Sequence, residues 1–326
     1  MQIIGNVIFT NISKMIKDDR KNILHLVYYS MLEAILVLSI PLSSSFVINS
    51  VLAHATISVF VLGAIVSIVF VFVTFLQGIK EYIVEKFQQK IFLKSGIEIA
   101  IKSLAMKNKE FVDEDANKKL MNYFFDITSI QKIFPVLLLD GVGLVVKIIV
   151  SLLLLFVFDS TLFFLGLFFF FGYLIVLVML GNHGIEYALE RSDAKHKAIY
   201  FLQHIRKEEG TQNEILGKFD DYLTIYAKAR QKSFSVIIKQ LMFTFFSEGL
   251  IFSVFLIVGG YLVIQGALPL GEFVAAEIVV MSITYALKSF AKQLDYVYDM
   301  IEGLYKINKL SVGLEDKNED KDHEKV

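Results

Sequence analysis

The longest uncharged stretch of this sequence is the feature that most limits what the chain can fold into. Residues 34–79 contain no Asp, Glu, Lys or Arg, and the same is true of residues 160–185 and 249–271. A helix needs about 20 apolar residues to cross the hydrocarbon core of a membrane, which is about 30 Å thick. The first stretch is long enough for two crossings, because small and polar residues at 49–56 divide it. These stretches predict a polytopic membrane protein.

Composition supports this interpretation, since only 20% of the residues are charged and 55% are hydrophobic, whereas a soluble domain has about 25% charged residues. The chain contains no Cys, which excludes disulfides and thiolate chemistry. The first 22 residues lack the pattern of a signal peptide, so we expect the first span to remain in the mature protein. We predict an all-α membrane protein with six transmembrane helices at residues 23–48, 57–79, 133–158, 162–180, 241–264 and 273–287.

The positions of the positive charges predict the orientation. Of the 32 Lys and Arg residues, all except Lys147 lie before the first span, in residues 80–132, in residues 191–239, or from Lys288 onward. Cytoplasmic loops of membrane proteins are enriched in Lys and Arg. We therefore expect a multi-pass protein of the cytoplasmic (inner) membrane, with both termini and both long connections in the cytoplasm.

Both long connections have the pattern of helices rather than of loops. Ile79, Ile83, Phe87 and Ile91 recur every four residues, with charged residues between them, which is typical of an amphipathic helix. This helix is predicted to continue the second span without a break. The connection after the fourth span repeats the pattern around a polar turn at 208–214. We predict two long helical hairpins that project into the cytoplasm, with tips at about residues 107–119 and 208–216.

Three stretches of sequence add a family resemblance. They are residues 41–52 (PLSSSFVINSVL), 111–126 (FVDEDANKKLMNYFFD) and 266–276 (GALPLGEFVAA). In register with six spans and two hairpins, they resemble the transmembrane domain of type I ATP-binding cassette exporters, most closely the permease domains of peptide and protein exporters. The resemblance covers about residues 20–312. Asn49 stands where that family usually has Asp, and Asn117 where Gly is common.

The resemblance implies that the hairpin tips form short coupling helices that dock into a groove of an ATPase. The residues in these positions are Phe111, Val112, Asp113, Glu114, Thr211, Asn213 and Ile215. Taken without the resemblance, the tips could equally be solvated turns at the end of a stalk.

One feature departs from the family, whose members usually continue into a nucleotide-binding domain. Residues 313–326 form a charged tail that we expect to be disordered, and the chain has no G-x-x-x-x-G-K-[ST] phosphate loop. We therefore expect no enzyme activity from this chain, with ATP and magnesium bound by a partner ATPase. The predicted organisation is a cytoplasmic segment at 1–22, a six-helix domain at 23–312 and the tail.

Ionisable side chains at membrane depth cost about 2.5–3.5 kcal/mol each by insertion scales, so they are candidates for function. They are Glu33, Asp140, Lys147, Glu248 and Glu277. One interpretation has the three Glu residues line a pathway, where they bind a cationic substrate or carry protons. The other has Lys147 pair with an acid while the rest face a watery cavity. The six His residues have no metal-ligand spacing, so we expect no metal, and the dispersed Lys residues give no basic stripe for nucleic acid.

Three functions follow for such a chain. The first is the permease subunit of an ABC-type exporter that works with a separately encoded ATPase. It would act as a homodimer, or as a heterodimer with a homologous permease, and move a peptide, protein or amphipathic substrate. The second is a proton-coupled transporter on the same scaffold, similar to the SbmA/BacA-type peptide transporters. The third is a membrane scaffold of a secretion assembly that transports nothing itself.

Overall fold

The computed structural model describes residues 20–54, 59–107 and 139–302, and this part of the chain is helical without any strand. Six helical segments in it are long and apolar enough to cross a membrane, which confirms the prediction of an all-α, multi-pass membrane protein with six spans. The helices are α2 (Arg20–Val37), α3 (Ser39–Leu52), α4 (Val59–Lys107), a helix at Leu139–Phe158, α6 (Ser160–Leu180), α7 (Gly184–His204), α8 (Gln212–Ile264) and α9 (Leu270–Ala291).

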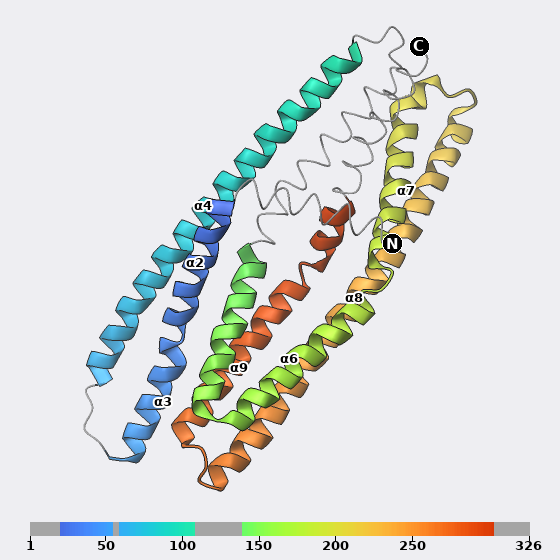
Figure 1. Ribbon diagram of the computed structural model, residues 1–326. Coiled ribbons are helices and arrows are strands. Elements are labelled where there is room, and N and C mark those ends of the chain that lie inside the picture. The colour runs from blue at the N-terminus through green and yellow to red at the C-terminus, as the bar shows by residue number, and fades with distance from the viewer. Residues whose placement is uncertain (1–19, 55–58, 108–138, 303–326) are drawn as a thin grey trace, which may run out of the picture.

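The helices run side by side in an elongated bundle (Figure 1). The apolar core lies between the helix Leu139–Phe158, α6, α8 and α9, where Leu155, Leu162, Phe255 and Val279 are all at most 2% exposed. In Figure 1, α2 and α3 lie beside α4. Contacts between α3 and α9 attach this group to the rest of the bundle.

The first span is bent. α2 ends at Val37, and α3 continues after a turn at Leu38. Pro41 explains the bend, because its ring has no N–H and clashes with the carbonyl group four residues earlier. The predicted span at 23–48 is therefore two helices, interrupted at Leu38, rather than one continuous helix.

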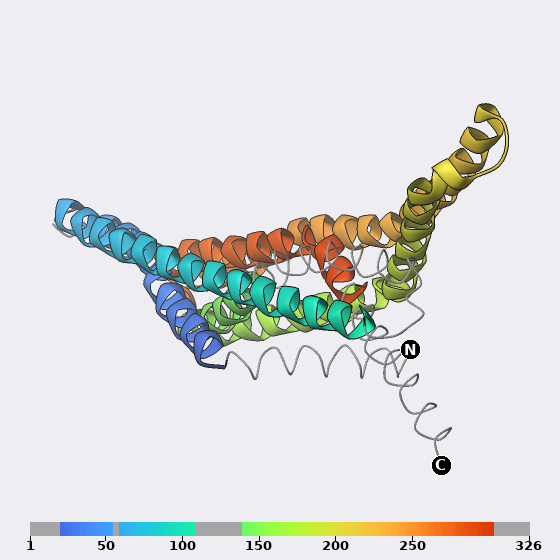
Figure 2. The same ribbon diagram turned by 90° about the horizontal axis from the view of Figure 1, so that it is seen from above.

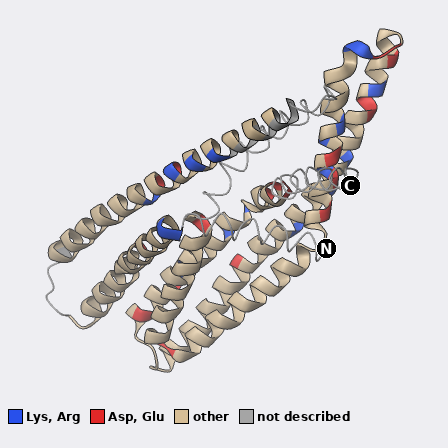
Figure 3. Cartoon of the chain, turned by 45° about the horizontal axis from the view of Figure 1, so that its top comes forward, with Lys and Arg blue, Asp and Glu red and all other residues tan. Residues whose placement is uncertain are grey.

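α4 is a single helix of 49 residues. At 1.5 Å per residue it is about 70 Å long, which is more than twice the thickness of the hydrocarbon core. This confirms the prediction that the second span continues without a break into an amphipathic helix. The charged residues gather on the second half of α4 and along α7 and α8, while the other end of the bundle is nearly free of Lys and Arg (Figure 3).

The second long connection begins at a break in the helix, whereas the described part of the first, on α4, continues its span without one. α6 ends at a turn in which His183 has a φ of 67°, in the left-handed region, and α7 begins again at Gly184. α7 and the first half of α8 then form a helical hairpin, called the α7–α8 arm below, whose outer end stands clear of the other described helices (Figure 2).

The tip of this arm contains a short 3-10 turn at Ile205–Lys207, and α8 begins at Gln212. A separate short helix at residues 208–216, as the resemblance implied, is not formed. The reason is local: Thr211 and Glu214 make a capping box, which satisfies free backbone N–H groups and starts the long helix directly. The other predicted tip, at about 107–119, lies outside the described residues apart from Lys107, and so does the tail at 313–326.

Candidate functional site

A cavity of about 780 Å³ lies between α2, α3, α4, the helix Leu139–Phe158 and α9. Its size falls within the usual range for small-molecule sites. Most of its wall is apolar, with contributions from Val37, Leu144 and Val279. Five charged residues also line it: Glu33, Lys80, Glu81, Asp140 and Lys147. Three of the five ionisable residues predicted at membrane depth therefore come together around one cavity.

Glu33 on α2 is held by two residues of α4. The Lys80 ammonium group donates to its carboxylate in an ion pair whose side chains are 10% and 17% exposed, and Gln77 Nε2 donates to Glu33 Oε1 at 2.8 Å. A buried ion pair is tolerated when further hydrogen bonds satisfy the charged groups. This group joins α2 to α4 at the wall of the cavity.

Asp140 and Lys147 lie two turns apart on one face of the helix Leu139–Phe158, as the sequence predicted, and both line the cavity. The side-chain amide of Gln293 donates to Asp140 Oδ2. Gln293 lies in the turn directly after α9. Asp140 therefore connects the wall of the cavity to the end of α9.

Glu248 and Glu277 do not line this cavity. Glu248 on α8 accepts a hydrogen bond from Lys288 on α9 at 2.8 Å, and the Lys288 ammonium group lies 5.5 Å from the centre of the Phe245 ring. Glu277 Oε2 is buried and has no hydrogen-bond partner among the described residues. The structure thus separates Glu33 from the two other acids that the pathway hypothesis grouped with it.

The sequence analysis did not single out Lys80 and Gln77. Lys80 was assigned to the amphipathic helix beyond the second span, where a lysine is expected to face water. Its side chain is instead 10% exposed. One feature of the sequence could have indicated this burial: Lys80 is the first charged residue after the long uncharged stretch.

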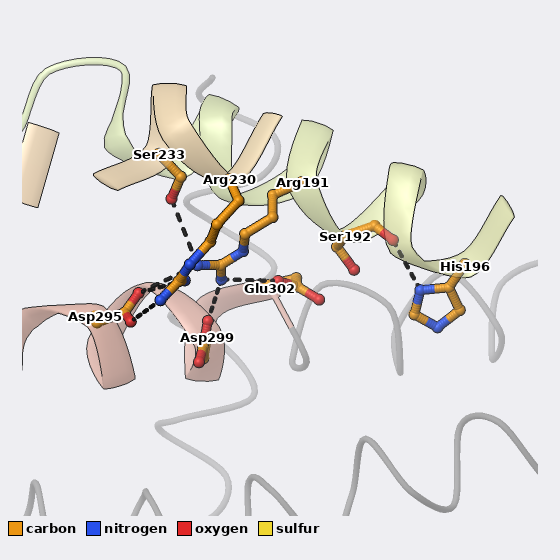
Figure 4. Close-up of polar contacts among 8 residues, drawn as sticks. All are labelled: Arg191, Ser192, His196, Arg230, Ser233, Asp295, Asp299 and Glu302. Carbon is orange, nitrogen blue, oxygen red and sulfur yellow. Dashed lines mark hydrogen bonds and ion pairs between the residues drawn. The ribbon is translucent and has the colours of Figure 1, made fainter. Parts of the chain in front are cut away.

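A second polar cluster, which we call the arm clamp, joins the α7–α8 arm to the helix at residues 294–302 that follows α9. The Arg191 guanidinium group is 6% exposed and donates to Asp295 Oδ1 at 3.1 Å, to Glu302 Oε2 at 3.4 Å and to Asp299. Arg230 on α8 donates to Asp295 Oδ2 at 2.8 Å. Figure 4 shows both arginines reaching toward the three carboxylates.

The arm clamp lies beyond the uncharged stretch of α6 and after the last residue of α9. Burial by itself would lower the pKa of Arg191, but the carboxylates of Asp299, Glu302 and Asp295 outweigh it and raise the pKa, so the group stays charged. Burial by itself would raise the pKa of Asp295, but Arg230 and Arg191 hold it below its usual value. Arg191 and Asp295 are therefore ionised near neutral pH, whereas burial raises the pKa of Asp299.

Sequence reasoning missed the arm clamp. Asp295, Asp299 and Glu302 are spaced by four and three residues, which places them on one face of a helix. That spacing was visible, but nothing in the sequence indicated that Arg191, more than 100 residues earlier, would face them.

The base of the arm packs tightly against the same C-terminal helix. A Cβ atom at Gly184 would lie 2.5 Å from the ring of Tyr298, so only a glycine fits there. Tyr298 donates to Gln240 Oε1 at 3.3 Å, and Gln240 Nε2 donates to the carbonyl oxygen of Leu177 at 3.2 Å. α6, α7, α8 and residues 294–302 thus meet at one junction.

Two of the three stretches that carry the family resemblance meet in space. Gly271 N at the start of α9 donates to Asn49 Oδ1 at 2.9 Å, and a Cβ atom at Gly271 would lie 2.4 Å from the carbonyl oxygen of Ser45. These positions lie 222 residues apart in the sequence. The polar residue near the end of the first span and the glycine before the sixth therefore form one close helix contact.

The predicted coupling residues are only partly described. Phe111, Val112, Asp113 and Glu114 lie outside the described residues. Thr211, Asn213 and Ile215 lie together at the start of α8, where Thr211 N donates to Glu214 Oε2 at 2.8 Å. The hydrogen bonds from Thr211 hold the pKa of Glu214 below its usual value.

The fold and the cavity define a multi-pass helical membrane protein. No protein-family model matches the chain, and no curated protein sequence matches it. Within the described ranges, no group of three His, Asp or Glu residues is arranged to hold a metal ion.

Proposed function

We propose that this chain is the permease subunit of an ATP-driven exporter of the ATP-binding cassette type and works with a separately encoded ATPase. The observation that carries the proposal is a continuous set of contacts from the arm to the cavity. The arm clamp joins Arg191 and Arg230 to Asp295, and Gln293, two residues earlier in the chain, bonds to Asp140 in the cavity wall. A force on the tip would therefore reach the cavity.

The proposed mechanism follows from these contacts. A partner ATPase that binds the tip at Thr211, Asn213 and Ile215 would move the α7–α8 arm as a lever when it binds and hydrolyses ATP. Ion pairs removed from water resist separation, so residues 294–302 would move with the arm. That motion would shift α9 against Asp140 and change the access to the cavity, with ATP and magnesium held by the partner.

A second permease copy, identical or homologous, is part of the proposal. Met281 and Tyr285 on α9 are 56% and 69% exposed, and Glu277, whose Oε2 is buried, lies one turn before Met281 and two turns before Tyr285. A second copy packed on this face would cover both exposed side chains and keep Glu277 away from lipid, where a charged group would cost several kcal/mol. We propose that the second copy covers this face and that the substrate, a peptide, protein or amphipathic molecule, passes between the copies.

The test is ATP hydrolysis. The chain is reconstituted in nanodiscs with each stand-alone ATP-binding cassette ATPase of its source organism, and ATP hydrolysis is measured. One ATPase is expected to be stimulated severalfold, and Ile215→Asp is expected to abolish the stimulation because it places a charge in the docking contact. Ile225→Asp is the matched control, since Ile225 is 53% exposed and lies about 15 Å further along α8.

Orientation gives an independent check, helped by the absence of Cys from the sequence. Asn213→Cys is expected to react with a membrane-impermeant maleimide only after cells are opened, and Gln265→Cys in intact cells. Reaction of Asn213→Cys in intact cells would rule out the proposal, because a cytoplasmic ATPase could not reach the tip.

Glu277 favours a second candidate, the proton-coupled transporter. Its buried Oε2 has no hydrogen-bond partner among the described residues, and a carboxyl group in that setting can bind and release a proton. This candidate predicts peptide uptake by proteoliposomes under a pH gradient without ATP, and loss of that uptake in Glu277→Gln. Uptake that requires ATP and survives Glu277→Gln would exclude it.

A further inference from the structure

The charged groups around the cavity divide into those that are already neutralised and those that are not. Glu33 is paired with Lys80 and accepts a hydrogen bond from Gln77. Glu81 is exposed at the surface of α4. Asp140 is bonded to the neutral amide of Gln293 and has no cationic partner within the described ranges. These ranges also offer Lys147 no hydrogen bond or ion pair, although Glu33 acts on it electrostatically.

Two charged residues remain, both on the helix Leu139–Phe158. Asp140 and Lys147 are seven residues apart, so their backbone positions lie on the same face, about 10 Å apart along the helix axis. Both line the cavity. One wall of the cavity therefore presents a negative and a positive group, while the wall formed by α2 and α4 carries the paired Glu33 and Lys80 and the exposed Glu81.

Ser30 provides an independent indication that the cavity is built for a ligand. Ser30 lines the same cavity and is only 3% exposed. Its hydroxyl oxygen has no hydrogen-bond partner among the described residues. A buried hydroxyl group without a partner is costly. A polar group on a ligand would satisfy it.

We infer that this cavity binds a small amphipathic zwitterion, whose cationic group pairs with Asp140 and whose anionic group pairs with Lys147. The two ligand charges lie about 10 Å apart to match the helix, and an apolar body between them packs on the other walls. A ligand with a single charge would leave one of the two protein charges unpaired in a medium of low dielectric constant. Binding of this ligand does not depend on the proposed function. Only its role as the transported substrate rests on that function.

Four versions of one tripeptide test the charge pattern. An extended tripeptide is about 10 Å long, so radiolabelled Leu-Ala-Leu places its two end charges at the required separation. The peptide is prepared with free ends, with an acetylated amino end, with an amidated carboxyl end, and with both ends blocked. Binding to the full chain in nanodiscs is measured by equilibrium dialysis. The free peptide is expected to bind at least tenfold more tightly than each blocked form.

Two variants assign the ends. In Lys147→Met, amidation of the peptide is expected no longer to weaken its binding, whereas acetylation still weakens it. In Asp140→Asn, acetylation is expected no longer to weaken binding, whereas amidation still weakens it. Lys232→Met serves as the control for loss of a lysine, since Lys232 pairs with Glu190 on the exposed arm, and it should preserve the order of the four peptides.

The outcomes separate the inference from the proposed function. Equal binding of all four peptides, or no binding of any, overturns the inference even if an ATPase is stimulated. Tight binding of the free peptide alone supports the inference even if no ATPase is stimulated, in which case only the permease proposal fails. The comparison of the four peptides on the unchanged chain decides the matter if either variant does not fold.

Discussion

The last turns of α4 and the α7–α8 arm have similar amphipathic sequences, yet apolar residues on them differ sharply in exposure. On α4, Phe87 and Ile91 are buried, but further along Ile97, Ile101 and Leu104 are 60–65% exposed. On the α7–α8 arm, Phe201 is 7% exposed and stacks on Phe219 with ring centroids 6.0 Å apart. The end of α4 leaves these apolar residues exposed, while the arm folds back on itself and buries Phe201 between its two helices.

The difference lies in what each segment packs against. The α7–α8 arm has a partner helix within the hairpin and is held at its base by the arm clamp. On the last turns of α4, Ile97, Ile101 and Leu104 are mostly exposed. Amphipathic helices gain most of their stability from packing rather than from helix propensity. The same sequence pattern therefore gives a packed hairpin in one place and exposed apolar side chains in the other.

Loss of the arm clamp should have the largest effect. Arg191→Met leaves Asp295, Asp299 and Glu302 without their shared cation, and removal of one partner from a buried ion pair costs about 3–5 kcal/mol. Thermal unfolding in nanodiscs, followed by circular dichroism, measures the loss. Lys232→Met removes an exposed ion pair of the same arm, with 2.8 Å between the charged atoms, and should leave the unfolding temperature nearly unchanged. Equal losses for the two variants would mean that the clamp does not brace the arm.

An apolar truncation on each segment compares their packing directly. Phe201→Ala on the arm is expected to cost about 3 kcal/mol, since it removes a buried ring that also contacts Tyr222. Ile101→Ala on α4 should change stability by about 0.5 kcal/mol or less, because its side chain is 60% exposed. The same unfolding measurement serves for both. A large loss from Ile101→Ala would show that the apolar side of α4 is covered in the reconstituted protein.

A glycine pair is expected to change stability in opposite directions. Gly184→Ala places a methyl group 2.5 Å from the Tyr298 ring, and such overpacking costs about 1–3 kcal/mol. Gly96→Ala on α4 meets no atom within 4 Å and should stabilise the helix by about 0.5–1 kcal/mol, because alanine loses less freedom on folding. If both variants were stabilising, the base of the arm would be looser than the structure indicates.

Helix number and helix length were predictable because their causes are local. The absence of charge from residues 34–79 and the four-residue spacing from Ile79 to Ile91 fix two spans and the long extension of α4 without reference to any other part of the chain. The bend at Leu38 was also encoded locally, by Pro41. The direct start of α8 at Gln212 was missed because the capping box of Thr211 and Glu214 was not weighed against the family pattern.

The candidate site was predictable only in part. The cost of ionisable groups in a membrane singled out Glu33, Asp140 and Lys147, which share one cavity. The same argument could not separate them from Glu248, because its partner Lys288 comes from another helix. Lys80 was missed since its burial depends on how α2 lies against α4.

By itself the sequence determined six apolar helices and two long amphipathic connections, since hydrophobicity and periodicity act over one helix at a time. Only the tertiary structure decided which charges face the cavity, which are neutralised, and which helix the arm is fastened to. Those outcomes depend on contacts between residues as far apart as Arg191 and Glu302, which are separated by 111 positions. Such distant pairs leave no periodic signal in the sequence, because the packing of the helices alone brings them together.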